Sequence, residues 1–487
     1  MVGAFSAARV RAAEEALMAG LPDGELMSRA AAGLAEVCRV RLSARDGTTV
    51  VGLVGPGNNG GDALFALARL AADGFGCVAV RGGWPVHEEG LEAARGAGVR
   101  LVDGTDAGAA AAALAHADLV VDGVLGIGGR PGLPEVAAPW VDAVPDGAYV
   151  VAVDLPSGQD PSGESGSDSG VFADETVTFG VPKPVHLMPA TEPAVGRLTV
   201  VDIGLDVEGA PDVERLGWDD VAALWPVPSA ADDKYSRGVL GVVAGGEDYT
   251  GAPVLCCTAA VEAGVGMVRY CGTPTPTALV RAAVPEAVVG EGRVQAWVVG
   301  PGLDLAARPT GSRAQLGVAR SALASDLPVL VDAGGLDLVT SARTGPTLLT
   351  PHAGELARLL TRLEGHEVTR EDVAARPLAS ARRAADALDA TVLLKGSTTL
   401  VVPPTASGRP VRSQADAPPW LATAGAGDVL AGLAGTLLAA GLDPIDAGSL
   451  AALVHGVAAD RANPGGPLRA LAVARGIPAT VAALLSR

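Results

Sequence analysis

The sequence predicts an α/β protein built from two domains, each a three-layer α/β/α arrangement with helices on both faces of a mostly parallel sheet. The chain has 487 residues, whereas a single hydrophobic core rarely serves more than about 300. Short apolar runs typical of strands alternate with longer helical stretches along almost the whole chain. Most of these runs are apolar at every position, as is typical of parallel strands that helices cover on both faces.

The first domain is predicted at residues 1–210. Residues 7–40 follow a helical pattern, and the apolar run at residues 49–54 ends in Gly-Pro-Gly, which is typical of a buried strand that enters a loop. Helical and strand-like segments alternate from there on. The further strands are predicted at residues 77–80, 119–121, 149–153, 176–179 and 198–201.

The second domain is predicted at residues 225–487. Between residues 205 and 229 the alternation gives way to Pro, Gly and acidic residues, and we place the linker there. The alternation then resumes, with helices between the strands and two more helices near the C-terminus. The strands are predicted at residues 239–244, 267–270, 297–299, 329–331, 347–349, 392–394 and 400–402.

The net charge of −19 and the pI near 4.7 exclude nucleic acid as the main partner, because phosphate backbones are bound by a surplus of Lys and Arg. A small anion remains compatible, since helix N-termini can bind it locally. The five cysteines are odd in number and show no C-x-x-C spacing, so we expect buried thiols in a reducing compartment rather than disulfides or a zinc site.

The N-terminal segment and the apolar runs predict a cytoplasmic protein with no membrane partner. Arg9, Arg11, Glu14 and Glu15 interrupt the first twenty residues, so we expect no signal peptide. The longest uncharged apolar run, residues 429–442, is about 14 residues long. A helix needs about 20 to span a bilayer.

The segment VGPGNNGGDAL at residues 54–64 places a glycine-rich loop between a strand and a helix. Ligands bind at the carboxyl ends of parallel strands, and the helix N-terminus that follows favours phosphate. The run from Asn58 to Asp62 adds two amides and a carboxylate, which a plain turn does not need. A ligand-binding loop is therefore expected here.

Two more predicted strand ends of the first domain carry polar residues. Asp122 precedes a glycine-rich loop, and Asp154 and Ser157 lie in the sequence DLPSG. Asn59, Asp122 and Ser157 could supply the oxygen ligands of a monovalent or divalent cation, and Asp154 could transfer a substrate proton. The alternative is that each aspartate caps a helix.

Together with FGVPKP at residues 179–184, the motifs GPGNNGGD, DGVLGIGG and DLPSG resemble the NAD(P)H-hydrate epimerase domain over nearly all of residues 1–205. The resemblance implies a Rossmann-like fold and interconversion of the R and S epimers at C6 of the hydrated nicotinamide ring. It implies a potassium ion at Asn59, Asp122 and Ser157, with Asp154 as the acid/base. Ala63 departs from the glycine expected in the loop. The residues implied to bind the hydrated nucleotide are Asn58, Asn59, Gly60, Gly61, Asp62, Gly126, Ile127, Gly128, Gly129, Arg130, Pro131, Gly132 and Asp154.

In the second domain, TAGAGD at residues 423–428 precedes an apolar helical run and predicts an anion hole at a helix N-terminus. Asp428 would face that hole, where a carboxylate can take the proton of a hydroxyl that attacks a nucleotide phosphorus. The alternative is a simple helix cap. Lys395 starts a turn with three hydroxyls, Ser397 to Thr399, which suits phosphates and ribose. His352 lies at a strand-to-helix junction, where we expect a binding role, and Glu355 either shares it or interacts with the helix dipole.

These motifs resemble the ribokinase-like fold and, more narrowly, the ADP-dependent NAD(P)H-hydrate dehydratase domain over about residues 225–487. The narrower resemblance rests on residues 234–246, YTGAPVL, VGPGL, TPHAGE and AGAGD. It implies that the C6 hydroxyl of the S epimer is phosphorylated by ADP, with Mg²⁺, and that elimination of phosphate regenerates NAD(P)H and leaves AMP. Glu247, Gly334 and Gly335 depart from the expected pattern. The residues implied are Ala252, Gly302, His352 and Asp428 for the hydrated nucleotide, and Lys395, Gly396, Ser397, Thr398, Thr399 and Gly427 for ADP.

The two resemblances together predict a bifunctional metabolite-repair enzyme, an isomerase that feeds the S epimer to a lyase. The alternative is a ribokinase-like small-molecule kinase with a non-catalytic, ligand-binding N-terminal domain. We expect the partners to be NADHX, NADPHX and ADP, together with other copies of the chain in a homo-oligomer.

Overall fold

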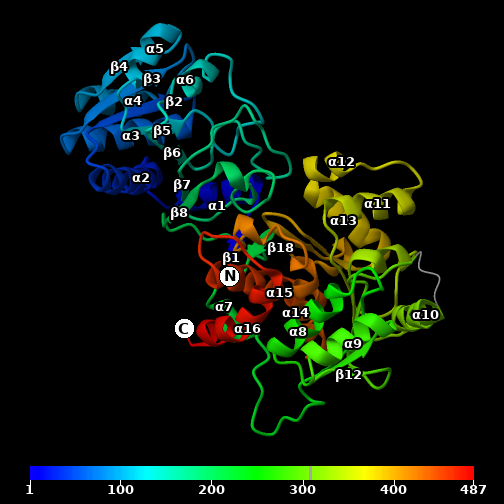
Figure 1. Ribbon diagram of the computed structural model, residues 1–487. Helices are drawn as coiled ribbons and strands as arrows, with labels where there is room; N and C mark the ends of the chain where they lie inside the picture. Colours follow the sequence, from blue (N-terminus) through cyan, green and yellow to red (C-terminus); the bar gives the residue numbers. More distant parts are fainter. Residues whose placement is uncertain (306–309, 487) are drawn as a thin grey trace. The chain divides into compact units, whose positions relative to one another are not determined.

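The computed structural model describes residues 1–305 and 310–486, and the chain divides into two compact units (Figure 1). The N-terminal unit comprises residues 3–213, and the C-terminal unit comprises residues 1–2 and 214–487. Each unit contains one sheet with helices on both faces. The predicted α/β class is therefore confirmed.

The seven strands of the N-terminal unit are all parallel, and their spatial order reverses between β2 and β5. This order is that of a Rossmann-like sheet, in which ligands bind where the strand order reverses. Every strand predicted for this domain is present. β4 is an additional strand, which the sequence did not indicate because its first and last residues are charged. In spatial order the strands are β4 (Arg100–Asp103), β3 (Gly76–Arg81), β2 (Thr49–Val54), β5 (Leu119–Gly123), β6 (Tyr149–Val153), β7 (Glu175–Phe179) and β8 (Arg197–Val201).

Helices cover both faces of this sheet. On one face, α2 (Glu25–Ala44), α3 (Asn58–Ala72) and α4 (Glu88–Gly96) pack on the strands through Ala, Val and Leu side chains. On the other face, α5 (Ala107–Leu114) and α6 (Ala138–Asp142) enclose Trp140. The ring of Trp140 is fully buried, and its Nε1 donates to the carbonyl oxygen of Gly104 at 2.9 Å, so the indole loses no hydrogen bond on burial.

The helical pattern predicted at residues 7–40 corresponds to two helices, α1 (Ala7–Met18) and α2. Gly20, Pro22 and Gly24 separate them. Gly24 has a φ of +75°, a left-handed conformation that glycine adopts without strain.

The C-terminal unit is built on an eleven-stranded sheet, although Gly3, Ala4 and Val213, in two strands at one edge of that sheet, are counted with the N-terminal unit. Its strands are parallel in the spatial series from β12 to β16, whereas β17 pairs antiparallel with β16 and β18 pairs antiparallel with β17. The strand order reverses between β10 and β13. In spatial order the strands are β1 (Val2–Ala4), β9 (Val213–Arg215), β18 (Val411–Gln414), β17 (Thr399–Val402), β16 (Thr391–Leu394), β15 (Thr347–Leu349), β14 (Val329–Val331), β13 (Ala296–Val299), β10 (Val239–Val243), β11 (Met267–Cys271) and β12 (Val288–Val289).

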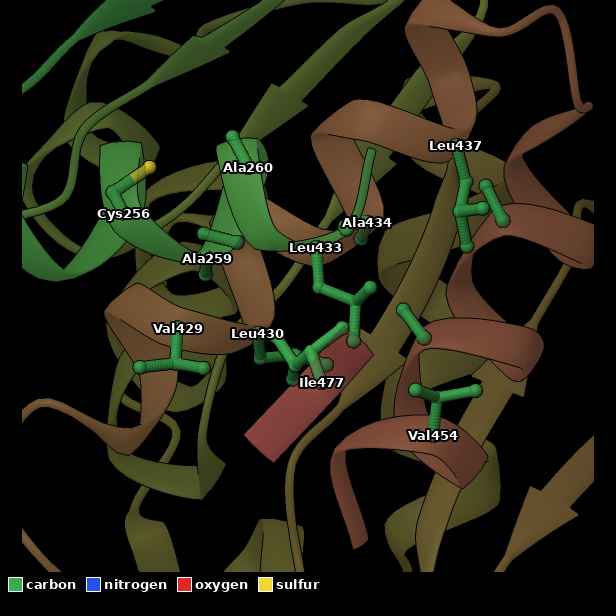
Figure 2. Close-up of a cluster of buried hydrophobic side chains, with 14 of the residues drawn as sticks. Cys256, Ala259, Ala260, Val429, Leu430, Leu433, Ala434, Leu437, Val454 and Ile477 are labelled. Carbon is green, nitrogen blue, oxygen red and sulfur yellow. The ribbon is translucent and has the colours of Figure 1, made fainter. Parts of the chain in front are cut away.

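One face of this sheet carries the main core of the C-terminal unit (Figure 2). α14 packs so closely against α8 that a Cβ at Gly432 would lie 2.1 Å from the carbonyl oxygen of Cys256. Small residues at this contact therefore allow the two helices to approach. The main helices on this face are α8 (Gly251–Glu262), α14 (Ala426–Ala439), α15 (Pro444–Ala462) and α16 (Ala470–Leu485), and α7 (Asp220–Leu224) and α9 (Pro274–Ala283) also contribute to this core. On the other face, α10 (Thr310–Ala324) and α13 (Pro377–Leu388) pack on the strands, and α11 (Ala353–Glu364) and α12 (Arg370–Ala375) pack against α13.

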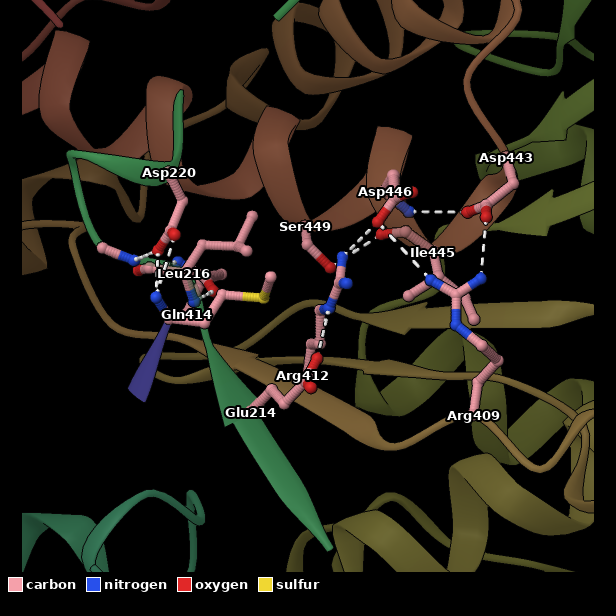
Figure 3. Close-up of polar contacts among 12 residues, drawn as sticks. Glu214, Leu216, Asp220, Arg409, Arg412, Gln414, Asp443, Ile445, Asp446 and Ser449 are labelled. Atoms are coloured by element: carbon pink, nitrogen blue, oxygen red, sulfur yellow. Dashed lines mark hydrogen bonds and ion pairs between the residues drawn. The ribbon is translucent and has the colours of Figure 1, made fainter. Parts of the chain in front are cut away.

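The predicted linker, residues 205–229, contains regular structure: β9 and the short helix α7 (Asp220–Leu224). The polar residues of β9 have partners on β18 (Figure 3). Arg412 is 4% exposed and donates to Glu214 at 3.1 Å and to Asp446, and the backbone N–H of Leu216 donates to Gln414 at 2.9 Å. Buried polar pairs of this kind carry no apolar pattern, so the sequence indicated neither β9 nor β18.

All five cysteines are buried and unpaired, as expected from the sequence: Cys38, Cys77, Cys256, Cys257 and Cys271. Burial raises the pKa of each of these thiols. Within residues 1–305 and 310–486, none of the helices combines the length and the apolar character of a membrane span.

Candidate active sites

A cavity of about 1130 Å³ lies in the N-terminal unit where the strand order reverses. It brings together residues from three predicted loops: Asn58, Asn59, Asp62, the segment 126–129 and Asp154. Gly60 and Gly61 are buried in the first turns of α3, and Arg130, Pro131, Gly132, Asp122 and Ser157 are not among the residues that line the cavity.

The glycine loop after β2 needs its glycines for close backbone packing. A Cβ at Gly55 would lie 1.8 Å from the carbonyl oxygen of Val124, and one at Gly60 would lie 2.1 Å from that of Gly55. The N-terminus of α3 can therefore open directly onto the cavity, where its free N–H groups favour an anion. Ala63, the departure from the expected loop, is fully buried in the core and does not line the cavity.

Asn59 and Ser157 meet at the carbonyl oxygen of Leu125, and Ser157 joins this group to Asp122. Asn59 donates to this oxygen at 3.0 Å and to that of Val153 at 2.7 Å, and the Ser157 hydroxyl lies 3.2 Å from it. Asp122 accepts from the hydroxyl and the backbone N–H of Ser157, at 2.6 and 2.8 Å. Burial raises the pKa of Asp122 to about 6, although the hydrogen bonds from Ser157 oppose this shift.

Asp154 follows β6 in a left-handed conformation, with a φ of +65° that is strained for a residue with a side chain. Its Oδ1 accepts from Lys183 Nζ at 2.6 Å and from Thr178 at 3.0 Å. Lys183 is 1% exposed, and its remaining donors reach Thr178 Oγ1 at 2.9 Å and the carbonyl oxygen of Phe179 at 3.2 Å. Burial alone would raise the pKa of Asp154, but Lys183 lowers it below its ordinary value.

His186 holds the backbone of the same segment. Its Nδ1 accepts from the backbone N–H of Lys183 at 2.9 Å, so Nε2 carries the proton and donates to the carbonyl oxygen of Asp154 at 2.7 Å. Burial, and then the nearby Lys183 ammonium, lower the pKa of His186 to about 4. The imidazole is therefore neutral at physiological pH and fixes the strained turn at Asp154.

In the C-terminal unit, Asp428, Gly427 and Lys395 converge with Asp332 at the carboxyl end of the parallel strands. α14 begins after Gly425, which has a φ of +88°. A Cβ at Gly427 would lie 3.4 Å from Lys395 Nζ and 4.0 Å from Asp332 Oδ2. Lys395 donates to Asp332 Oδ1 at 2.7 Å, and Thr350 donates to the same oxygen at 2.9 Å.

Burial and the neighbouring charges together determine the protonation state of Asp428. Burial first, and then the neighbouring Asp332 carboxylate, raise the pKa of Asp428 to about 7, and Lys395 opposes the shift. A carboxyl group with a pKa near neutrality is suited to accept a proton at physiological pH. Lys395 itself has a raised pKa: burial lowers it, but Asp332 and Glu355 more than offset that effect.

His352 and Glu355 together cap the N-terminus of α11. His352 Nδ1 accepts from the N–H groups of Gly354 and Glu355 at 3.1 and 3.2 Å, and the Glu355 carboxylate accepts from the His352 N–H at 2.8 Å. The two residues therefore cap α11 reciprocally. A parallel bridge joins His352 to Lys395, so the cap lies beside the Lys395 turn.

The remaining predicted residues lie in two groups. Ala252 and Gly302 are adjacent, since a Cβ at Gly302 would lie 2.8 Å from that of Ala252. In the turn after β16, Gly396 and Ser397 are exposed, Thr398 is buried, and Thr399 is the first residue of β17.

Two comparisons with known families match most of the chain. Residues 23–185 match the family described as YjeF-related protein N-terminus, and residues 240–469 match the family described as NAD(P)H-hydrate dehydratase. The bifunctional NAD(P)H-hydrate repair enzyme Nnr of Mycobacterium leprae is 44% identical over 484 residues, which cover 95% of this chain and 94% of that protein. The Nnr enzyme of Mycobacterium tuberculosis strain H37Rv is also 44% identical, over 90% of this chain and 89% of its own.

The chain belongs to the family of bifunctional NAD(P)H-hydrate repair enzymes. This confirms the sequence-based interpretation as an isomerase and a lyase in one chain, over the alternative of a kinase with a non-catalytic N-terminal domain. It also confirms the fold class, a Rossmann-like unit followed by the ribokinase-like dehydratase fold. A crystal structure of the ADP/ATP-dependent NAD(P)H-hydrate dehydratase from Bacillus subtilis, co-crystallised with ATP and Mg²⁺, is 26% identical and covers 56% of this chain and 100% of its own, with a TM-score of 0.49.

Three residues of these candidate sites were given no specific catalytic or binding role from the sequence. Lys183 and His186 lie in or beside FGVPKP, which was quoted as a motif, and Lys183 is one of only three lysines in the chain. Asp332 directly follows β14, as Asp154 follows β6. An aspartate directly after a buried parallel strand was therefore the available signal for Asp332.

Proposed function

We propose that residues 1–210 catalyse the interconversion of R and S hydrated NAD(P)H, and that residues 225–487 dehydrate the S epimer with ADP. One observation carries this proposal: each unit holds a lysine–aspartate ion pair at the carboxyl ends of its parallel strands, next to a glycine-led helix N-terminus. Lys183 and Asp154 form the first pair, and Lys395 and Asp332 form the second. Two separate sites fit two successive reactions.

In the epimerase site, the hydrated nucleotide would occupy the cavity of about 1130 Å³, with Asp154 as the acid/base. The helix N-terminus at Asn58 would bind phosphate. Gly60, Gly61, Arg130, Pro131 and Gly132 would support the loops, because they do not line the cavity. The residues proposed to contact the nucleotide are Asn58, Asn59, Asp62, Gly126, Ile127, Gly128, Gly129 and Asp154.

A potassium ion fits the group formed by Asn59, Asp122 and Ser157. All three offer oxygen ligands, and the carbonyl oxygen of Leu125 lies within hydrogen-bond distance of Asn59 and Ser157. Within the described residues, the buried Asp122 carboxylate accepts hydrogen bonds only from neutral groups, so its charge is uncompensated. A bound potassium ion would supply that positive charge and hold the three loops together.

In the dehydratase site, Asp428 would take the proton of the C6 hydroxyl as that oxygen attacks the β-phosphorus of ADP, and AMP would leave. Loss of the phosphate from C6 and of a proton from C5 then forms the ring double bond of NAD(P)H. Lys395 to Thr399 and Gly427 would hold ADP, with Mg²⁺ on its phosphates, and Ala252, Gly302 and His352 would contact the hydrated nucleotide.

The test follows the near-ultraviolet absorbance of NADH when the protein meets mixed R and S hydrated NADH with Mg²⁺ and ADP, with ATP, or with no nucleotide. Full ADP-dependent recovery from both epimers supports the proposal. Recovery that stops at the S fraction contradicts the epimerase assignment, and absence of recovery contradicts the dehydratase assignment. We also propose that the enzyme acts in the cytoplasm as a homo-oligomer, which light scattering and cell fractionation can check.

A further inference from the structure

Two buried carboxyl groups face the cavity of the N-terminal unit, and their surroundings are opposite. Asp154 Oδ1 accepts hydrogen bonds from Lys183 and Thr178. Asp62, on the first turns of α3, is 7% exposed and accepts no hydrogen bond from the described residues. A carboxyl group buried without a donor favours its protonated form, because the charged form is poorly solvated.

The charges near Asp62 act in the same direction. Burial raises the pKa of Asp62 well above its ordinary value, and the carboxyl groups of Asp154 and Glu14 raise it further. Lys183 opposes them, but its three N–H donors are taken up by Asp154, Thr178 and Phe179. The other titratable or charged side chains that line the cavity are Arg11, Glu15, Asp23, Arg69, His87 and Glu89.

We propose that Asp62 is a second catalytic residue of the epimerase, a protonated acid that works with the ionised Asp154. The inference rests on the proposed epimerase function and goes beyond a binding role for Asp62. The two carboxyl groups come from different elements, α3 and the turn after β6, and both line the same cavity. Paired carboxyl groups in contrasting environments are a common acid/base arrangement.

Asp62 gives its proton to the C6 hydroxyl, the C6–O bond breaks, and water leaves with both electrons of that bond. The lone pair of the ring nitrogen forms the N1=C6 double bond of an iminium ion. Water then adds to the opposite face of C6, the N1=C6 electron pair returns to nitrogen, and Asp154 takes the proton released. Asp62 is then ionised and Asp154 protonated, so the reverse conversion runs with exchanged roles.

The test is Asp62→Asn in the full chain, with R/S exchange of hydrated NADPH followed by proton NMR. ADP is omitted, so the dehydratase stays silent. The amide has the shape of the carboxyl group but gives no proton, so kcat should fall at least about 100-fold, the usual contribution of a general acid. Binding of NADP⁺, measured by calorimetry, should change less than threefold. The alkaline limb of the pH–rate profile should disappear, and the acidic limb, set by Asp154, should remain.

The matched control is Asp73→Asn, which changes an exposed aspartate at the other end of α3, outside the cavity, and should leave exchange unaltered. Suppose that the wild type is active. An Asp62→Asn variant whose kcat lies within tenfold of the wild-type value, or whose pH–rate profile keeps its alkaline limb, then overturns the role of Asp62 but not the epimerase function. Parallel loss of NADP⁺ binding also overturns it, in favour of a binding role. A wild type that exchanges no faster than buffer overturns the epimerase function as well.

A second variant covers a folding failure of Asp62→Asn. Asp62→Glu keeps an acid one methylene further out. It should exchange more slowly than wild type and retain the alkaline limb. A Glu variant that folds and exchanges without an alkaline limb overturns the proposal.

Discussion

Replacing Lys183 by Met should destabilise the N-terminal unit by about 3–5 kcal/mol, the usual cost of leaving a buried charge without its partner. Lys183 is 1% exposed, and its Nζ lies 2.6 Å from Asp154 Oδ1. Met fills a similar volume, so the lost ammonium rather than a cavity accounts for the change. The pair can be isolated with Asp154→Asn and the double variant, which should show a coupling energy of about 2–3 kcal/mol.

The pH dependence of this destabilisation follows from the shifted pKa of Asp154. In the wild type that pKa lies below its ordinary value, so the stability that the pair contributes is present at neutral pH and is lost as the pH falls through the lowered pKa. Without Lys183, burial raises the pKa of Asp154, and the cost of ionising it grows as the pH rises. The deficit of the variant should therefore be largest at pH 7–8 and should shrink toward about pH 4.

Hydrogen-exchange mass spectrometry in increasing urea can measure these values, because its peptides report each unit separately. Arg39→Met is the matched control, since the exposed guanidinium of Arg39 pairs with Glu36 and Asp73. It should cost at most about 1 kcal/mol. A Lys183→Met deficit no larger than that of the control, or one that is equal at pH 4 and pH 7.5, would refute the role given to the pair.

The further predictions concern the two reactions. Asp428→Asn should lower the dehydration rate at least about 100-fold and leave R/S exchange unchanged, whereas Asp154→Asn should lower R/S exchange and leave dehydration unchanged. Absorbance assays of dehydration and NMR assays of exchange on the same samples check both predictions. Near-normal dehydration by Asp428→Asn would count against Asp428 as the base, and near-normal exchange by Asp154→Asn would count against Asp154. Because Asp428 must be ionised and its pKa is raised to about 7, the dehydration rate should fall as the pH drops below 7, and a flat profile from pH 5.5 to 7.5 would contradict this. Asp332→Asn removes a like charge and releases Lys395 toward Asp428, so the midpoint of that profile should move to lower pH by about one unit or more, and an unmoved midpoint would exclude the coupling. Replacement of potassium by tetramethylammonium should slow R/S exchange if Asp122 helps to hold the ion, and an unchanged rate would argue against that site.

The strands at the centre of both sheets could be predicted because they are apolar along their whole length. β2 and β6, for example, begin and end at the residues that the sequence indicated. β4 could not, because its two apolar residues lie between Arg100 and Asp103 at the edge of the sheet. β18 is buried but polar, and only the tertiary partners of Arg412 reveal why such a segment is stable inside.

The candidate sites were predictable where glycines and acids share one short loop, as at Asn59, Asp154 and Asp428. Residues that act through another residue were not. Lys183 reaches Asp154 from 29 positions further along the chain, and Asp332 meets Lys395 from 63 positions away. No local pattern encodes such a pairing, because it arises only when parallel strands bring their ends to one edge. His352 could be placed at a helix start from sequence, but its reciprocal cap with Glu355 required coordinates.

The five buried cysteines can serve as native probes of local opening, because their reactivity depends on exposure of the thiol. Their thiols are protonated and shielded, so a reagent that attacks thiolates reacts only after the surrounding structure has opened. Cys38 and Cys77 belong to one half of the enzyme, and Cys256, Cys257 and Cys271 belong to the other. Thiol-labelling rates at these positions, measured by mass spectrometry, would thus report the rate of local opening in each catalytic half without an added tag. They would also show in which half this rate increases first when substrate, ADP or potassium is withdrawn.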